Sequence, residues 1–102
     1  MKSIEQIRKH FSLGKYDLSA HALQRAIERK IMFFEIEEAG ANAEIIEDYP
    51  DDKISPSCLL LGYSKSGKAL HILVSKADID YLRIITVYEP DSDIFDNDIK
   101  RR

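Results

Sequence analysis

The spacing of apolar residues changes near Glu44, and this change constrains the fold more than any other feature of the sequence. Before Glu44, apolar residues recur every three or four positions, which is typical of amphipathic helices. After it, they alternate with polar residues or form short runs bounded by Gly and Pro, which is typical of strands. Helices followed by strands with short connections predict an α+β domain, with helices packed on one face of an antiparallel sheet.

Helices are expected over residues 3–11, 19–30 and 32–39. Ser3 and Gln6 occupy the positions of a capping box at the start of the first helix, and Gly14 is its expected stop. Ser19 is the expected N-cap of the second helix. The third helix is expected to end at Gly40.

Four strands are expected after Glu44, over residues 44–49, 57–63, 68–75 and 81–89. The intervening turns at 64–67 and 77–80 are short, so the strands should form an antiparallel meander. Residues 15–18 are interpreted as a short connector. The whole chain, 1–102, is expected to be one domain, with an N-terminal helix (1–14), a core of helix and four-stranded sheet (15–90) and a polar tail (91–102). A short turn around Ile94-Phe95 could dock the tail against the body.

Size and charge limit the classes of function. A chain of 102 residues is long enough for a single hydrophobic core. The net charge of −3 argues against a large basic surface for nucleic acid, although a small positive site is still compatible with it. The single cysteine, Cys58, lies in an apolar run, where a buried and inert thiol is expected. The lack of a disulfide framework or a long apolar segment favours a cytoplasmic protein with no membrane partner.

One polar stripe stands out on the second helix. His21, Arg25 and Arg29 follow one another at intervals of four residues, so they lie along one side of the helix. Leu23 and Ile27 fall on a different side and are interpreted, with Ala26, as the core stripe. Arginine suits phosphate binding and histidine suits proton transfer. The alternative is an ordinary solvent-facing stripe paired with surface acids.

A second group of polar residues is expected on the sheet. If the four residues after Lys76 form the loop, Lys76 pairs with Tyr81 and His71 lies opposite Thr86. His71, Thr86 and Tyr88 then share one face, within reach of one another. Such groups can hold a phosphate or move a proton. The alternative is that they are ordinary residues of half-buried strands, and a one-residue slip in register would separate them.

Several short motifs, taken in order, resemble the bacterial family called domain of unknown function 4258. They are Ser19-x-His21-Ala22-x-x-Arg25-x-x-x-Arg29, Ile45-Ile46-Glu47-Asp48-Tyr49-Pro50, Leu60-Leu61-Gly62-Tyr63, Leu70-His71-Ile72 and Ile85-Thr86-Val87-Tyr88-Glu89-Pro90. The resemblance extends from Leu18 to Pro90. It implies the small ribonuclease-like fold shared by barnase, the EndoU nucleases, the colicin tRNases and the RelE-type toxins.

The resemblance also implies an activity, namely metal-independent cleavage of RNA without a cofactor by attack of the 2′-OH on the adjacent phosphate. The implied site has two acid–base groups, two phosphate-binding groups and two orienting groups: His21 and His71, Arg25 and Arg29, and Thr86 and Tyr88. The implied partners are an RNA substrate and a cognate antitoxin protein.

Two features depart from what the resemblance implies. The chain is acidic, whereas RelE-type toxins are usually basic, and its basic residues are scattered, which argues against dependence on the ribosome. A non-catalytic binding or regulatory module on the same fold is the alternative function. That alternative predicts that the two histidines lie far apart and that an exposed apolar or mixed surface dominates. The sequence predicts no oligomeric state.

Overall fold

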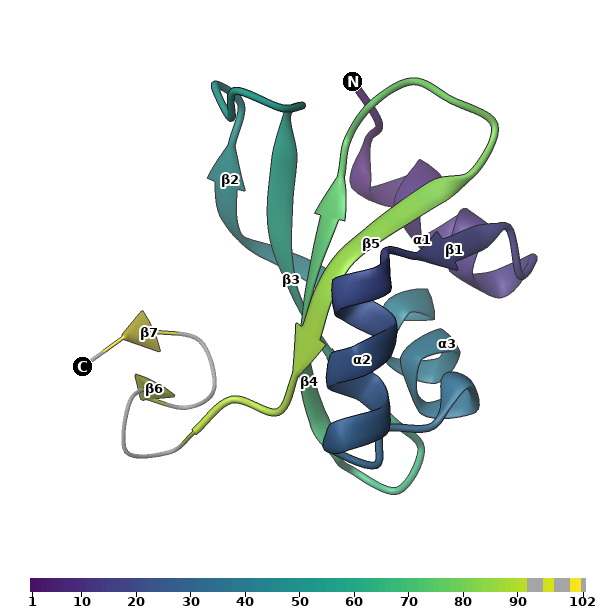
Figure 1. Ribbon diagram of the computed structural model, residues 1–102, viewed down its shortest axis with the longest axis vertical. Coiled ribbons are helices and arrows are strands. Elements are labelled where there is room, and N and C mark those ends of the chain that lie inside the picture. The colour runs from purple at the N-terminus through teal and green to yellow at the C-terminus, as the bar shows by residue number, and fades with distance from the viewer. Residues whose placement is uncertain (92–94, 97–99, 102) are drawn as a thin grey trace.

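Three helices and a five-stranded mixed sheet make up the body of the chain in a computed structural model (Figure 1). The structure describes residues 1–91, 95–96 and 100–101, with side chains for residues 1–91. The elements are α1 (Ile4–Ser12), β1 (Tyr16–Leu18), α2 (Ala20–Glu28), α3 (Phe33–Ala41), β2 (Glu44–Tyr49), β3 (Ser57–Tyr63), β4 (Ala69–Ser75), β5 (Leu82–Tyr88), β6 (Phe95–Asp96) and β7 (Lys100–Arg101). The α+β class expected from the change in spacing is confirmed.

The sheet has the strand order β1-β5-β4-β3-β2. Strands β2 to β5 form the expected antiparallel meander, but β1 adds a fifth strand parallel to β5. The prediction of a four-stranded, purely antiparallel sheet was therefore wrong. Strand β1 has only three residues, too few for a period to be recognised, and its partner lies far along the chain. Asp17 lies opposite Arg83 and forms an ion pair with it at 2.9 Å.

The first two helices begin where their capping residues predict. The Ser3 side chain accepts a hydrogen bond from the backbone N–H of Gln6, and the Gln6 side chain accepts one from Ser3. Gly14 follows α1 with a φ of 68°, a left-handed conformation that favours glycine. The hydroxyl of Ser19 accepts a hydrogen bond from the N–H of Ala22 at the start of α2. These local signals were sufficient to predict where the helices begin. Each capping side chain accepts a hydrogen bond from a backbone N–H that has no partner within its own helix.

Gly40 was predicted to end α3, and this was wrong. The glycine lies inside the helix and is buried. A Cβ at this position would lie 2.2 Å from the ring of Phe11, so the glycine permits close packing of α1 against α3. Gly62 plays a similar part on β3, where a Cβ would lie 2.0 Å from the carbonyl oxygen of Ala39. Both glycines are therefore explained by contacts between elements, which no local signal in the sequence describes.

A β-bulge in β5 reverses which residues face the core. On β4 the side chains alternate regularly, with Leu70, Ile72 and Val74 fully buried in the core. On β5, Leu82 and Ile84 face the core, but the strand register shifts at Ile85 and Val87 faces the core after it. Regular alternation along β5 would place residues 82, 84, 86 and 88 on one face, and the bulge breaks that alternation.

The bulge also changes the pairing of β4 with β5. His71 lies opposite Tyr88, and Leu73 lies opposite Thr86. The predicted pairing of His71 with Thr86 was wrong for two reasons: the connection between the strands is one residue longer than assumed, and the bulge adds one more residue to β5. Since directly opposite residues share a face, His71, Thr86 and Tyr88 still lie on one side of the sheet, as expected.

Helix α2 presents a different side to the body than predicted. Ala22 and Ala26 are buried, whereas the side chains of Leu23 and Ile27 are 41% and 70% exposed. The small alanines let the helix lie close to β5, so the larger apolar side chains next to them turn outward. The prediction that Leu23 and Ile27 form the core stripe was wrong.

The C-terminal tail is described only in part. Phe95–Asp96 pairs with Lys100–Arg101 in an antiparallel ladder. The expected docking of a turn around Ile94-Phe95 falls outside the side chains that the structure describes. Over the described residues, no helix is both long and apolar enough to cross a membrane.

Candidate functional site on the open face of the sheet

The face of the sheet that does not carry the core contains a hollow of about 430 Å³. We call this face the open face. The lining residues come from four strands and the loop after β2: Glu47, Tyr49, Asp52, Ser57, Leu59, Leu73, Thr86 and Tyr88. Leucines form its apolar floor, and hydroxyl and carboxylate groups surround them. This volume is in the range that small-molecule sites occupy.

His71 and Tyr88 are joined directly on the open face. The Nδ1 atom of His71 lies 3.2 Å from the hydroxyl of Tyr88, and the ring centroids are 5.2 Å apart in an edge-on arrangement. His71 is fully buried, whereas Tyr88 is partly exposed and lines the hollow. The hydroxyl of Tyr88 is thus the link between the buried imidazole and the hollow.

Helix α2 runs along the edge of β5 and brings Arg29 to this pair. At the start of the helix, the Ser19 hydroxyl donates a hydrogen bond to the carbonyl of Ile85 at 2.9 Å. Just past its end, Nη1 of Arg29 donates to the carbonyl of Val87 at 3.3 Å. The Arg29 guanidinium carbon also lies 5.8 Å from the centre of the Tyr88 ring, a cation–π contact. Arg29, Tyr88 and His71 therefore form one contiguous group, which we call the Arg–Tyr–His cluster.

Two of the predicted site residues lie elsewhere on α2. His21 is exposed in the first turn of α2, close to Ser19, whose hydroxyl contacts the Ile85 carbonyl. His71 lies opposite Tyr88, three residues further along β5, and three strand residues span about 10 Å. Arg25 is partly buried and forms an ion pair with Glu28 at 3.4 Å. The structure thus brings Arg29, His71 and Tyr88 together, with Thr86 beside them, and places His21 and Arg25 outside this group.

Glu47 and Tyr49 line the other side of the hollow, although the sequence pattern predicted no role for them. Both belong to β2, and the Tyr49 hydroxyl donates a hydrogen bond to the Glu47 carboxylate. A register shift between Ile45 and Glu47 breaks the alternation of the strand, so its pattern does not reveal which side chains face the hollow. In the sequence, the sign that these two residues could belong to the site was that both lie in the motif of residues 45–50.

Three further ion pairs, formed by the two lysines that flank β4, support the sheet. Lys68 bridges the Glu35 carboxylate at 2.9 Å and the Glu89 carboxylate at 3.8 Å, which ties the start of α3 to the end of β5. The backbone N–H of Met32, together with Lys68, lowers the pKa of the Glu35 carboxyl below its ordinary value. Lys76 contacts Asp48 at 2.5 Å and is buried. These charges have partners, so they serve the fold rather than the hollow.

Among residues 1–91, the hollow is accompanied by neither a reactive thiol nor a metal centre. Cys58 is buried in the core, as expected, and burial raises the pKa of its thiol to about 11. Within the part of the chain that the structure describes, no group of three or more His, Cys, Asp and Glu residues is arranged to hold a metal ion.

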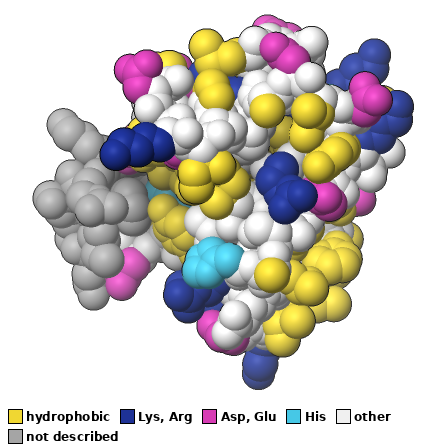
Figure 2. Space-filling model, turned by 45° about the horizontal axis from the view of Figure 1, so that its top comes forward, with side chains coloured by type: hydrophobic (Ala, Val, Ile, Leu, Met, Phe, Trp, Pro, Cys, Tyr) yellow, Lys and Arg dark blue, Asp and Glu magenta, His cyan; other side chains and the backbone are white. Residues whose placement is uncertain are grey.

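The positive groups on one face of the molecule do not gather into a basic surface (Figure 2). On the face drawn in Figure 2, the Lys and Arg side chains lie apart, with acidic and apolar side chains between them. In the Arg–Tyr–His cluster, Arg29 supplies the positive charge that suits a phosphate.

These features define an α+β protein with a hydroxyl-rich and carboxylate-rich hollow on the open face of a mixed sheet, bordered by an Arg–Tyr–His cluster. The chain belongs to the family described as Domain of unknown function (DUF4258), which matches residues 18–89. The match spans α2, α3 and the strands that form the hollow, so the membership expected from the motifs is confirmed. Comparisons with curated proteins and with solved structures gave no match.

Proposed function

We propose that this protein is a metal-independent endoribonuclease of the toxin–antitoxin type, with the ribonuclease-like fold of barnase and the RelE-type toxins. The observation that carries the proposal is the Arg–Tyr–His cluster at the wall of the hollow. It joins a group suited to phosphate, a hydroxyl and an imidazole in one place. The order of the family motifs supports the same activity, because the cluster residues lie within them.

The proposed reaction needs one group to remove a proton and another to supply one. The 2′-OH loses its proton, the O2′–P bond forms and the P–O5′ bond breaks. The departing 5′-oxygen takes up a proton, which leaves a 2′,3′-cyclic phosphate and a 5′-OH. Positioned side chains commonly accelerate such proton transfers by about 10²- to 10⁴-fold.

Glu47 and Tyr88 suit these two tasks because they line the hollow from opposite sides. Glu47 is on β2 and Tyr88 on β5, with β3 and β4 between them. Three strand spacings amount to about 14 Å between the backbones, and both side chains shorten that gap. We assign Glu47 as the acceptor of the 2′-OH proton and Tyr88 as the donor to the 5′-oxygen.

His71 acts through Tyr88 in this proposal. Its side chain is fully buried, so it is a positioning residue behind the phenol. In the tautomer with the proton on Nδ1, His71 donates to the Tyr88 oxygen, so the phenol O–H can be directed to the 5′-oxygen. After Tyr88 has given up its proton, the same hydrogen bond stabilises the phenolate until it takes a proton from solvent.

Arg29 and Thr86 supply binding and orientation. Arg29 uses one N–H for the Val87 carbonyl, so its remaining donors are available for a phosphate. The Thr86 hydroxyl lies next to Tyr88 on the same side of β5 and can donate to a second phosphate oxygen. His21 and Arg25 lie further along α2, where they would contact RNA beyond the scissile phosphate.

The test is cleavage of a defined RNA by the purified chain in the presence of EDTA. Wild-type protein should produce 2′,3′-cyclic phosphate ends, and Tyr88→Phe and Glu47→Gln should each lower the rate by about 10²- to 10⁴-fold. Tyr63→Phe and Glu44→Gln are the matched controls, because they make the same changes in the sheet, on β3 and β2, at positions that do not line the hollow. Equal rates for Tyr88→Phe and Tyr63→Phe would refute the assigned site.

A non-catalytic binding module is the second candidate, and one observation favours it. Ile27 and Leu23 of α2 are exposed, as are Phe33 and Phe34 at the start of α3. Exposed apolar side chains of this size are typical of surfaces that contact another protein. This reading predicts that wild-type protein leaves RNA intact in the same assay. If the ribonuclease proposal holds, a cognate antitoxin could use these side chains.

A further inference from the structure

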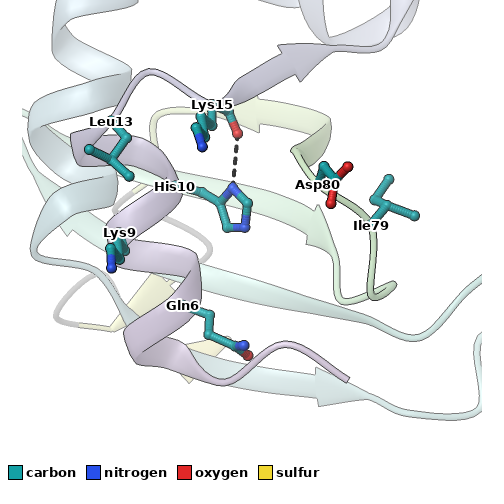
Figure 3. A pocket seen from close by; sticks show the side chains of 7 residues that line it. All are labelled: Gln6, Lys9, His10, Leu13, Lys15, Ile79 and Asp80. Carbon is teal, nitrogen blue, oxygen red and sulfur yellow. Dashed lines mark hydrogen bonds between the residues drawn. The ribbon is translucent and has the colours of Figure 1, made fainter.

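A second hollow, of about 350 Å³, lies away from the open face of the sheet. Residues of α1, of the turn between α1 and β1, and of the loop between β4 and β5 line it (Figure 3). It shares no residue with the hollow of the open face. Its volume also falls within the range of small-molecule sites, which is roughly 300–1,000 Å³.

Two lysines give this hollow positive charge in a chain whose net charge is −3. Lys9 and Lys15 both line it and are exposed. None of the ion pairs formed within residues 1–91 involves either ammonium group. Lys9 lies in the last turn of α1, where a cation also stabilises the helix dipole. Lys15 lies beyond the helix, so that explanation does not extend to it.

His10 is held in a fixed orientation between the lysines and the loop. Its Nδ1 lies 3.2 Å from the carbonyl oxygen of Lys15, and because a carbonyl only accepts, Nδ1 carries the proton. The second ring nitrogen, Nε2, is turned toward the space between Gln6 and Asp80 (Figure 3). It is an acceptor in the neutral ring and a donor in the charged ring, so it can meet either a hydroxyl or an anion.

The remaining walls carry apolar side chains on two opposite sides and one acidic side chain (Figure 3). Leu13 and Ile79 are 56% and 43% exposed and line the hollow. Asp80 lies across the hollow from Lys9 in Figure 3 and can accept hydrogen bonds from hydroxyl or amino groups. The hollow therefore combines two lysines, apolar side chains on two opposite sides and a carboxylate acceptor.

We propose that this second hollow binds a phosphate-bearing small molecule with an apolar ring and hydrogen-bond donors, as in a nucleoside monophosphate. Lys9 and Lys15 bind the phosphate, Leu13 and Ile79 contact the ring, and Asp80 accepts from a hydroxyl or amino group. The site does not depend on the proposed ribonuclease activity, because none of its residues takes part in that reaction.

The experiment is an NMR titration of the ¹⁵N-labelled full chain with adenosine monophosphate, adenosine or inorganic phosphate. Adenosine monophosphate should produce saturable shifts at Gln6, His10, Leu13, Ile79 and Asp80. Adenosine should bind at least about tenfold more weakly, because it lacks the charged hydrogen-bond acceptor. An absence of saturable shifts at these residues, or equal binding of adenosine, overturns the proposal.

A pair of double variants separates a local site from general charge. Lys9→Gln with Lys15→Gln should weaken binding of adenosine monophosphate at least about tenfold. Lys53→Gln with Lys65→Gln removes the same charge from exposed positions elsewhere and should change binding less than about twofold. All four lysines are exposed, so both proteins should fold. Equal weakening by the two double variants overturns the proposal.

Discussion

At the scale of single residues, side chains that look local in the sequence have distant partners in the fold. Arg29 was identified by its spacing from His21, yet what defines its place is the Val87 carbonyl and the Tyr88 ring. Gly40 resembled a helix stop, yet it makes room for Phe11. In each case the sequence indicates the type of residue, and tertiary packing determines what that residue does.

Gly62 gives a direct test of such packing. A Cβ at this position would lie 2.0 Å from the Ala39 carbonyl oxygen, which belongs to the backbone and cannot turn away. We expect Gly62→Ala to lower the free energy of unfolding by roughly 1–3 kcal/mol or more, measured by urea denaturation. Gly67→Ala, where the added Cβ meets open space at a φ of 90°, should cost only about 1–2 kcal/mol for backbone strain. A Gly62→Ala protein as stable as wild type would contradict the close contact between α3 and β3.

Cys58 gives a second test, with a defined pH dependence. The folded thiol has a pKa of about 11, against an ordinary value of 9.0, so the unfolded chain loses its proton first as the pH rises. Its contribution to stability is therefore complete below about pH 9 and declines between about pH 9 and 11. At pH 8, a disulfide reagent should label the folded protein at least about a hundredfold more slowly than protein in denaturant. Equal labelling rates would mean that Cys58 is accessible in the folded chain.

At the scale of elements, α2 shows why a helical pattern can predict a helix and miss its orientation. Its limits follow from the Ser19 cap and from the helical spacing. Its buried face consists of Ala22 and Ala26, because the helix lies along the edge of β5 where only small side chains fit. A rule that places the larger apolar residues inside selects Leu23 and Ile27 instead.

Substitutions on the two sides of α2 can verify this orientation. Ala26→Leu should lower the free energy of unfolding by roughly 1–3 kcal/mol, because the added atoms meet β5. Ile27→Gln should change it by no more than about 0.5 kcal/mol, because that side chain is 70% exposed. Both are read from urea denaturation curves. The reverse order of effects would restore the orientation first predicted from the sequence.

At the scale of the whole molecule, the order of the helices and of the four antiparallel strands was predictable from the sequence. The fifth strand and the irregular register of the sheet were not. The α+β class and the limits of β2 and β3 follow from the residue pattern alone. The parallel strand β1 and the bulge at Ile85 depend on contacts between distant segments. Two of the cluster's residues, His71 and Tyr88, were expected on one face, but their direct pairing and the hollow beside them became visible only in three dimensions.

The most direct test of the proposed site is to map where RNA binds. A short RNA with 2′-O-methyl groups lacks the attacking hydroxyl, so it should bind without being cleaved, and the ¹⁵N-labelled full chain can be followed by NMR. The largest shifts should occur at Glu47, Thr86 and Tyr88 and at the side-chain N–H of Arg29, and they should decrease with added salt. If the signals of these four residues do not change when the protein is saturated with RNA, the assignment of the open face as the site of RNA cleavage is contradicted.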